Sequence, residues 1–192
     1  MNLIAHKCNS FETIQQAINN GVKWIEFDVR YNTNKQVVLC HDEEDRNNPR
    51  NVILVDVVDY FSDCTFIVDI KVDGITNAEH LAKDVVRDIT SNNKNNWYLC
   101  SFNEYCVAEL SELRGEFDFK TGVISAGIPL GLFVHLHIDF VSLDYYILAE
   151  DVVNALRQRQ LEIFAYTVNT SYGLHKVRHL HVNGYISDYI FN

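Results

Sequence analysis

Short apolar runs alternate with amphipathic segments along almost the whole chain, and this alternation constrains the fold more than any other feature. The apolar runs predict eight strands, at residues 3–6, 24–30, 66–71, 97–102, 119–125, 140–143, 162–168 and 185–187. Helical spacing of apolar residues predicts helices at 11–20, 55–61, 77–90, 104–113, 150–159 and 171–180. Strands separated by helices pair in parallel through right-handed crossovers, and eight such units close into a barrel. We therefore expect an α/β protein, a compact TIM (β/α)8 barrel with shortened helices, because 192 residues are few for this fold.

A doubly wound open sheet is the alternative arrangement for the same order of elements. That fold usually binds phosphates through a glycine-rich loop after its first strand, and no such loop follows residues 3–6. We therefore favour the barrel and expect residues 1–192 to form one barrel domain. In such a barrel, functional side chains gather at the C-terminal ends of the strands. Four residues with suitable chemistry lie at or near predicted strand ends: His6, Asp28, Asp69 and Lys71.

The charge and the cysteine content exclude several classes of protein. A formal net charge of -10 argues against a nucleic-acid-binding protein, which needs a basic surface. No apolar run approaches the length of a membrane span, and the N-terminal segment lacks the apolar core of a signal peptide. The five cysteines show no metal-ligand spacing, and an odd set of this kind is typical of reduced thiols. We therefore expect a cytoplasmic protein without a transmembrane segment, and the sequence does not indicate its oligomeric state.

One stretch, residues 24–42, places two acids and a histidine close together. Glu26 and Asp28 are two residues apart in a predicted strand, so their side chains point to the same face. Two neighbouring carboxylates resist joint ionisation unless a cation or a proton lies between them. The next apolar run ends at His41-Asp42, which brings a histidine beside these acids. Taken alone, the stretch fits a metal or catalytic site, and it also fits a solvated strand face followed by a turn.

Seven short segments in a fixed order resemble the glycerophosphodiester phosphodiesterase family, a TIM-barrel group within the phospholipase-C-like phosphodiesterases. The segments are IAHKCN, WIEFDV, His-Asp at residues 41–42, VDIK, SF, YTVN and NGYISD, and they extend over residues 3–188. Each segment is weak evidence alone, but together they fall in the right order on successive strand ends. The resemblance implies an enzyme that hydrolyses phosphodiesters with the help of a bound metal ion.

The resemblance also implies roles for five side chains. His6 and His41 match the two catalytic histidines of the family, one acting as a base and the other as an acid. Glu26 and Asp28 match its metal-binding Glu-x-Asp pair, and Asp69 stands where a third carboxylate ligand is usually a glutamate. Oxygen ligands of this kind favour one divalent cation, Mg²⁺ or Ca²⁺, over zinc. We assign His6 as the base and His41 as the acid.

Four further residues match positions near the phosphate or the substrate in that family. Lys7, Lys71, Tyr166 and Asn169 are therefore expected to bind phosphate or substrate. The expected substrate is a small phosphodiester or a lysophospholipid. Lys7 replaces the arginine of the family's His-Arg-Gly motif, which keeps the positive charge but loses the bidentate fork. Tyr166 stands where the family usually has a tryptophan.

Other departures from the family pattern leave two alternatives open. The Pro-Glu-Asn-Thr segment that usually follows the first motif is missing. His-x-x-Asn at residues 6–9 and Asp-x-Lys at residues 69–71 are instead similar to the sphingomyelinase D branch, whose members act as lyases and release a cyclic phosphate. A lyase is therefore one alternative, and a non-catalytic binding barrel is the other. Retention of three acids and two histidines speaks against the second, because buried acids without a metal would destabilise the barrel.

Two other groups of histidines have spacings that could hold a metal ion. His135, His137 and Asp139 share one strand face, as in amidohydrolase-type enzymes, but in those enzymes the motif lies on the first strand. His175 and His179 are four residues apart on a predicted helix, and the helices cover the outside of a barrel. We therefore expect neither group to be a metal site.

Overall fold

The computed structural model describes residues 1–74, 76–91, 94–128 and 136–189. Its strands are β1 (Asn2–Ala5), β2 (Trp24–Tyr31), β3 (Val37–Leu39), β4 (Thr65–Ile70), β5 (Asn96–Ser101), β6 (Lys120–Ser125), β7 (Phe140–Asp144), β8 (Glu162–Tyr166) and β9 (Gly184–Ser187). Its helices are α1 (Phe11–Asn19), α2 (Leu54–Tyr60), α3 (Ala78–Thr90), α4 (Glu104–Leu113), α5 (Glu150–Gln158) and α6 (Ser171–His179). Every expected element is present, with ends shifted by one or two residues at most. None of the helices in these ranges is long and apolar enough to span a bilayer.

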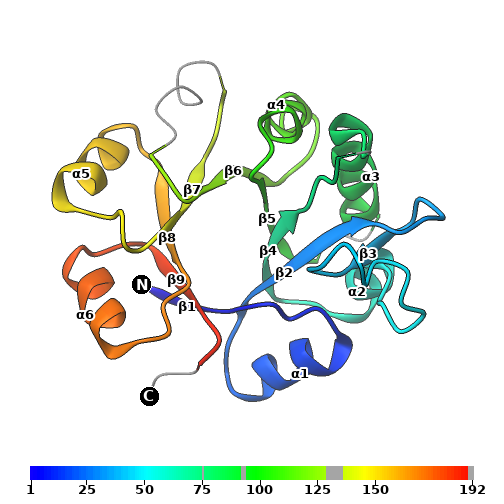
Figure 1. Ribbon diagram of the computed structural model, residues 1–192, viewed down its shortest axis with the longest axis horizontal. Helices are drawn as coiled ribbons and strands as arrows, with labels where there is room; N and C mark the ends of the chain where they lie inside the picture. Colours follow the sequence, from blue (N-terminus) through cyan, green and yellow to red (C-terminus); the bar gives the residue numbers. More distant parts are fainter. Residues whose placement is uncertain (75, 92–93, 129–135, 190–192) are drawn as a thin grey trace.

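Eight parallel strands close into a barrel (Figure 1). Hydrogen-bonded neighbours follow the order β1-β9-β8-β7-β6-β5-β4-β2, and pairing between β1 and β2 closes the ring. β3 lies outside the ring, where it pairs antiparallel with β2 and forms the extended hairpin that leads to residue 41. Short helices cover the outside between successive strands, and the described residues between β6 and β7 form no helix. The prediction of a compact TIM barrel is therefore confirmed.

Local sequence signals set the ends and the buried faces of the helices. Ser10 caps α1 through a reciprocal pair of hydrogen bonds with Thr13. Asn77, Asn103 and Thr170 accept hydrogen bonds from first-turn amides of α3, α4 and α6. Apolar residues at helical spacing turn one face of each helix toward the strands, and in α3 these are Leu81, Ala82, Val85, Val86 and Ile89. Capping and amphipathic spacing therefore specify helices that are short but well defined.

Side chains fill the barrel interior toward the N-terminal ends of the strands. Strand residues alternate between the helix layer and the barrel axis, and the inward set includes Trp24, Tyr98, Phe140 and Phe164. Tyr98 packs edge-on against Phe140 and Phe164, with ring centroids 5.3 and 5.7 Å away. Gly122 makes room for this packing, because a Cβ atom there would lie 2.4 Å from the Phe140 ring. This aromatic layer lies toward the N-terminal ends of the strands and closes that part of the barrel axis.

The cysteines are core residues. All five are buried, and none takes part in a disulfide. Burial raises the pKa of the Cys8 and Cys106 thiols to about 12, which keeps both protonated at neutral pH. These side chains therefore act as small apolar groups, as the sequence predicted.

Candidate active site

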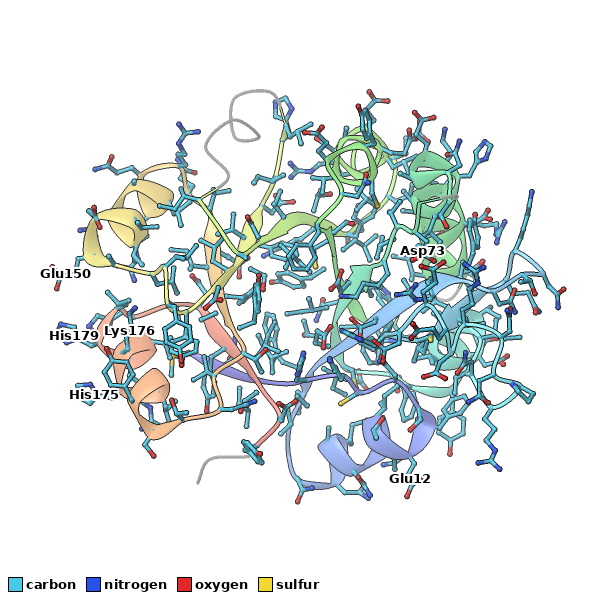
Figure 2. The ribbon with its side chains drawn as sticks, in the orientation of Figure 1. Glu12, Asp73, Glu150, His175, Lys176 and His179 are labelled. Atoms are coloured by element: carbon cyan, nitrogen blue, oxygen red, sulfur yellow. The ribbon has the colours of Figure 1, made fainter. Side chains whose placement is uncertain are left out.

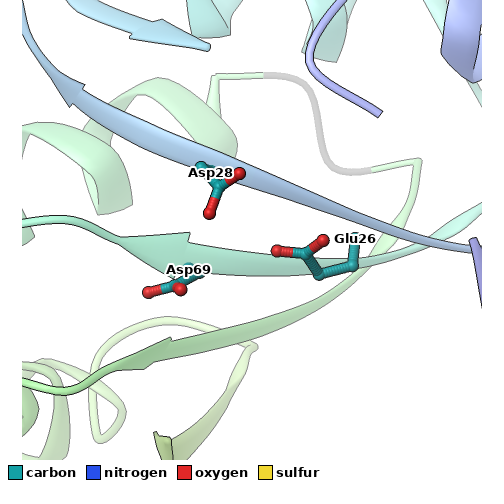
Figure 3. A group of neighbouring side chains, drawn as sticks. All are labelled: Glu26, Asp28 and Asp69. Carbon is teal, nitrogen blue, oxygen red and sulfur yellow. The ribbon is translucent and has the colours of Figure 1, made fainter. Parts of the chain in front are cut away.

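Three carboxylates from two neighbouring strands meet inside the barrel (Figure 3). Glu26 and Asp28 lie on β2, and Asp28 is paired in register with Asp69 on β4. Alternation along β2 turns Phe27 into the core beneath the helices and leaves both acids facing the barrel axis. One oxygen from each carboxylate lies within 4.8 Å of the others, and all three residues are at most 4% exposed. Strand parity and register therefore build one buried acidic cluster.

The acidic cluster fits a metal ion. Burial raises the pKa of Glu26 well above its usual value, and the charges of Asp28 and Asp69 raise it further. Burial also raises the pKa of Asp69 to about 6, although Lys71 opposes the shift. The Asp69 Oδ1 atom is buried without a hydrogen-bond partner among the described residues. A divalent cation would balance this charge and satisfy this oxygen, and carboxylates are the ligands that Mg²⁺ and Ca²⁺ prefer. No other three acids, histidines or cysteines within the described ranges come this close together.

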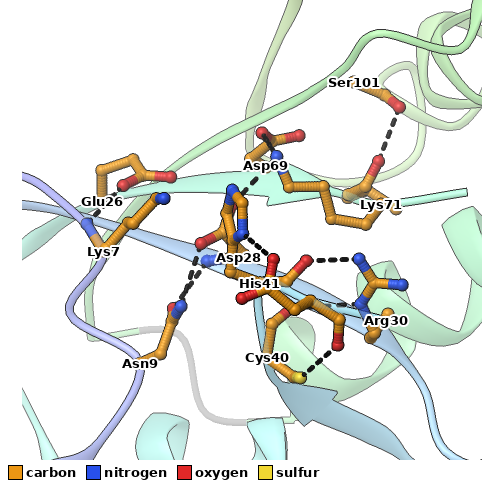
Figure 4. Close-up of polar contacts among 12 residues, drawn as sticks. Lys7, Asn9, Glu26, Asp28, Arg30, Cys40, His41, Asp69, Lys71 and Ser101 are labelled. Atoms are coloured by element: carbon orange, nitrogen blue, oxygen red, sulfur yellow. Dashed lines mark hydrogen bonds and ion pairs between the residues drawn. The ribbon is translucent and has the colours of Figure 1, made fainter. Parts of the chain in front are cut away.

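One lysine lies against the acidic cluster at the C-terminal end of β4 (Figure 4). The Lys71 Nζ atom lies 3.1 Å from Asp28 Oδ1 and in closer contact with Asp69 Oδ2. Burial opposes the charged form of Lys71, but the two carboxylates outweigh that effect and raise its pKa above the usual value. Lys71 is therefore a fixed positive charge beside the acids.

The segment after β1 holds the two acids of β2 in place. Asn9 donates from Nδ2 to Asp28 Oδ2 at 2.9 Å, and its Oδ1 accepts the Asp28 amide at 2.8 Å. The amide of Lys7 donates to Glu26 Oε2 at 2.8 Å, with Lys7 in the left-handed region at φ 50°. Asn9 is a site residue that the sequence comparison did not assign, although the His-x-x-Asn spacing pointed to it.

An acid that follows β9, Asp188, orients the His6 ring through a hydrogen bond. The Nδ1 atom of His6 lies 2.7 Å from Asp188 Oδ1, and the Nε2 atom of the same ring lies 4.0 Å from Glu26 Oε2. Because an ionised carboxylate can only accept, the neutral ring carries its proton on Nδ1 and turns its Nε2 lone pair toward the acids. Burial lowers the pKa of His6, and the hydrogen bond to Asp188 opposes part of that shift. His6 is therefore oriented to accept a proton at Nε2.

Asn169 holds Asp188, the partner of His6, in place through hydrogen bonds. Its Oδ1 atom accepts from the Ser187 hydroxyl at 3.1 Å and from the Asp188 amide at 3.0 Å, and its Nδ2 donates to Asp188 Oδ2. Burial alone would raise the pKa of Asp188, but the hydrogen bonds from His6 and Asn169 lower it below its usual value. Asn169, which was expected to bind phosphate or substrate, therefore contacts Asp188 and does not line the cavity. Asp188 was not assigned a role, although the NGYISD segment contains it.

His41 lies at the mouth of the barrel, on the loop after β3. Its side chain is 36% exposed, compared with 17% for His6, and its Nδ1 atom lies 2.8 Å from Asp42 Oδ1. The buried Arg30 side chain holds this loop by donating to two of its carbonyl oxygens, one of them that of His41. Arg30 also pairs with Asp73 at 2.5 Å. Arg30 and Asp73 therefore position the His41 loop, and no motif in the sequence had pointed to either residue.

A cavity of about 220 Å³ joins these groups at the C-terminal ends of the strands. It is lined by eight of the nine predicted site residues, namely His6, Lys7, Glu26, Asp28, His41, Asp69, Lys71 and Tyr166. A larger cavity, of about 620 Å³, lies between the β2–β3 hairpin and α3 and contains none of these residues. Charged groups with shifted pKa values converge only on the smaller of the two, which is therefore the candidate site.

The wall on the β5 to β9 side of this cavity is mostly apolar. Ile124, Ile186 and Phe102 line it together with Tyr166. Phe102 and Tyr166 meet edge to face, with ring centroids 6.3 Å apart, and Lys71 Nζ lies 5.5 Å from the Phe102 centroid. A bound molecule therefore meets charged groups on one side and, on the other, apolar groups together with the side chains of Ser142 and Tyr166.

The remaining histidines lie away from the cavity. Figure 2 shows His175 and His179 at the outer edge of the molecule, on α6, and His179 Nε2 lies 3.6 Å from Glu150 Oε1. Of the group at 135–139, His135 falls outside the described residues, and Asp139 pairs with Arg114 at 2.6 Å. Within the described residues, neither group forms a three-ligand cluster.

No family model matches the sequence, and no curated protein matches it by sequence. Solved structures do match the fold over almost the whole chain. A phosphodiesterase of Oleispira antarctica in complex with the product sn-glycerol-3-phosphate has a TM-score of 0.85 at 15% identity, covering 98% of this chain and 93% of that one. A glycerophosphodiester phosphodiesterase of Thermotoga maritima has a TM-score of 0.75 at 19% identity, with 98% and 95% covered.

A third match is a glycerophosphodiester phosphodiesterase of Parabacteroides distasonis, with a TM-score of 0.75 at 14% identity, covering 97% of this chain and 92% of that one. At these identities the likeness establishes the fold. These structural neighbours are phosphodiesterases, two of which carry the name of the family that the sequence motifs resemble.

Proposed function

We propose that this chain is a metal-dependent phosphodiesterase that hydrolyses glycerophosphodiesters to a phosphomonoester and an alcohol. One observation carries the proposal: three buried carboxylates within 4.8 Å of one another share a cavity with two histidines and a lysine. A phosphodiester is negative and has a poor leaving group, so its cleavage needs positive charge and two proton transfers. This cavity contains side chains for both needs.

The acidic cluster of Glu26, Asp28 and Asp69 would hold one divalent cation, Mg²⁺ or Ca²⁺. When bound, the ion would supply a Lewis acid that balances charge on a phosphoryl oxygen. Lys71 adds a positive charge that its carboxylate partners keep protonated. Lys7, which also lines the cavity, adds a second one near the expected phosphate.

The two histidines divide the proton transfers. His6 accepts a proton from the attacking water at Nε2, because Asp188 keeps the ring proton on Nδ1. His41 donates a proton to the departing oxygen from the mouth of the cavity, where the leaving group exits. The two rings therefore need opposite protonation states at the start of the reaction.

The proposed substrates are small glycerophosphodiesters and lysophospholipid head groups. The Oleispira antarctica neighbour was solved with the product sn-glycerol-3-phosphate, which supports a substrate of this class for the same fold. Phosphorus NMR of glycerophosphocholine and lysophosphatidylcholine, incubated with Mg²⁺ or Ca²⁺, tests the proposal. A phosphomonoester signal is expected, and no turnover of any substrate would favour a barrel that only binds.

A lyase that releases a cyclic phosphate is the second candidate. Two sequence features, His-x-x-Asn at residues 6–9 and Asp-x-Lys at residues 69–71, are similar to the sphingomyelinase D branch. Both lie in the candidate site, where Asn9 contacts Asp28 and Lys71 contacts Asp69. In that reaction a hydroxyl of the substrate attacks in place of water. The same NMR experiment distinguishes the two, because a cyclic phosphodiester has its own signal.

A further inference from the structure

Two buried hydroxyl groups on one wall of the cavity have no hydrogen-bond partner within the part of the chain that the structure describes. Ser142, on β7, is 1% exposed, and its Oγ atom has no hydrogen-bond partner among the described residues. The Tyr166 hydroxyl, at the end of β8, is also buried and unpaired within that part of the chain. Both residues line the cavity of about 220 Å³. Since buried hydroxyls in folded proteins nearly always have a partner, two unpaired ones in a single cavity indicate a ligand group that meets them.

Strand register brings the two hydroxyl-bearing side chains onto one wall. Asp144 on β7 pairs in register with Tyr166 on β8. Ser142 lies two residues before Asp144 on β7, and both Ser142 and Tyr166 turn their side chains into the cavity. Figure 1 shows β7 and β8 across the barrel from β2 and β4, which carry the acidic cluster. The cavity reaches both walls. One of the two ester groups of a phosphodiester held beside the acidic cluster and Lys71 can therefore extend across the cavity to Ser142 and Tyr166.

Resting on the proposed function, we infer that Ser142 and Tyr166 bind the free hydroxyl groups of a small polyol, such as glycerol, that is esterified to the phosphate. Each of these side chains can donate one hydrogen bond and accept another, as can each hydroxyl of a polyol. The Tyr166 phenol stays protonated at neutral pH, because burial raises its pKa to about 12.

Size and polarity agree with this ligand class. The cavity is smaller than the roughly 300–1,000 Å³ usual for drug-sized ligands, so it accommodates a three-carbon group and excludes two acyl chains. An unsubstituted alkyl group would fit the apolar side chains Ile124 and Ile186 on this wall but would leave both protein hydroxyls unpaired. Sites built to bind a substrate hydroxyl reject analogues that lack it for this reason.

Calorimetric titration of two matched ligands tests the inference. The protein, supplied with Mg²⁺ or Ca²⁺, is titrated with sn-glycerol 3-phosphate and with propyl phosphate, which has the same three carbons and no hydroxyl group. Wild type should prefer glycerol phosphate by at least about tenfold, and Ser142→Ala or Tyr166→Phe should each reduce this preference several-fold to about tenfold. Affinity for propyl phosphate should stay within about twofold in both variants.

Two variants serve as matched controls that remove buried hydroxyls elsewhere. Thr121→Val removes a hydroxyl on the outer face of β6, and Tyr98→Phe removes the phenol that contacts Glu162 and Lys120 at the other end of the barrel. Neither should change the ligand preference, so a change seen only at the cavity positions is not a general effect of lost stability.

The outcomes separate this inference from the proposed function. Equal affinity of wild type for the two ligands, or an unchanged preference in both cavity variants, overturns the inference even if the protein turns over glycerophosphodiesters. A clear preference that falls in the cavity variants supports the inference even if no substrate is hydrolysed, in which case the proposed hydrolase activity is the part that fails.

Discussion

The Nδ1 atom of His6 lies 2.7 Å from the Oδ1 atom of Asp188, although 182 positions separate the two residues in the chain. They meet because β1 and β9 pair in parallel, with Ala5 opposite Ser187. Closure of the barrel therefore creates the hydrogen bond that fixes the ring proton of His6. An open sheet with the same elements would leave the two residues apart.

Asp188→Asn should lower kcat by about 10²-fold or more. An amide can donate as well as accept, so it no longer keeps the His6 proton on Nδ1 and Nε2 loses its function as a base. Metal affinity and KM should change little, because Asp188 contacts His6 and Asn169 and none of the three acids. Steady-state kinetics with glycerophosphocholine measure the effect, with Asp118→Asn as a control at an exposed acid before β6. An unchanged kcat would mean that Asp188 does not orient the base.

His41→Ala should abolish turnover of choline esters but retain turnover of a nitrophenyl ester. A nitrophenolate leaves without a proton, so it bypasses an acid but not a base. His6→Ala should therefore remain inactive on both substrates. The measurement is the ratio of kcat values for the two leaving groups in each variant. Rescue of His6→Ala alone would reverse the assigned roles, and rescue of neither would contradict acid-base catalysis by this pair.

Asp73→Asn should both destabilise the protein and lower kcat. The change leaves the buried guanidinium of Arg30 without its charged partner, which costs roughly 3 kcal/mol when a buried pair is broken. It also loosens the loop that carries His41, so kcat should fall more than KM rises. Urea unfolding and kinetics measure the two effects. Arg87→Gln, which removes an exposed side chain paired with Asp84 and Asp88, is the control and should cost less than about 1 kcal/mol. Equal losses in the two variants would count against the buried pair.

Metal-free protein should lose the stabilising contribution of Asp69 as the pH rises. The folded-state pKa of about 6 lies above the unfolded value of about 3.9, so the folded chain keeps a proton that the unfolded chain has lost. This contribution is fully present below about pH 4 and disappears as the pH passes 6. The free energy of unfolding is measured for wild type and for Asp69→Asn in the presence of a chelator. The difference, wild type minus variant, should fall by up to about 3 kcal/mol between pH 4 and pH 7. A constant difference over this range would contradict a protonated, buried Asp69.

Strand parity predicted that the first two acids of the cluster share a face, and the family resemblance added the third. Glu26 and Asp28 are two residues apart in one strand, and Asp69 lies at the same level in the strand that pairs with it. Alternation of strand and helix predicted parallel pairing, and the count of eight strands without a glycine-rich loop favoured a barrel over an open sheet. Motif order then indicated that His6 and His41 belong to the same end of the barrel.

Contacts between distant segments could not be predicted in this way. Asn169 belongs to a family motif, yet the loop after β8 turns its amide toward Asp188 and away from the cavity. Arg30 and Asp73 lie 43 positions apart, and nothing local marks them as a pair. Ser142 is one small residue in a buried strand, and only the structure reveals that it lines the cavity with no hydrogen-bond partner for its hydroxyl among the described residues.

Titration of Mg²⁺ or Ca²⁺ into metal-free protein, followed by calorimetry and by turnover of glycerophosphocholine in the same samples, tests the central claim most directly. We expect one ion per chain, turnover that rises in proportion to occupancy, and loss of both in Asp28→Asn, because the acidic cluster binds the ion. Full turnover in the presence of a chelator, or ion binding that is unchanged in Asp28→Asn, would contradict it.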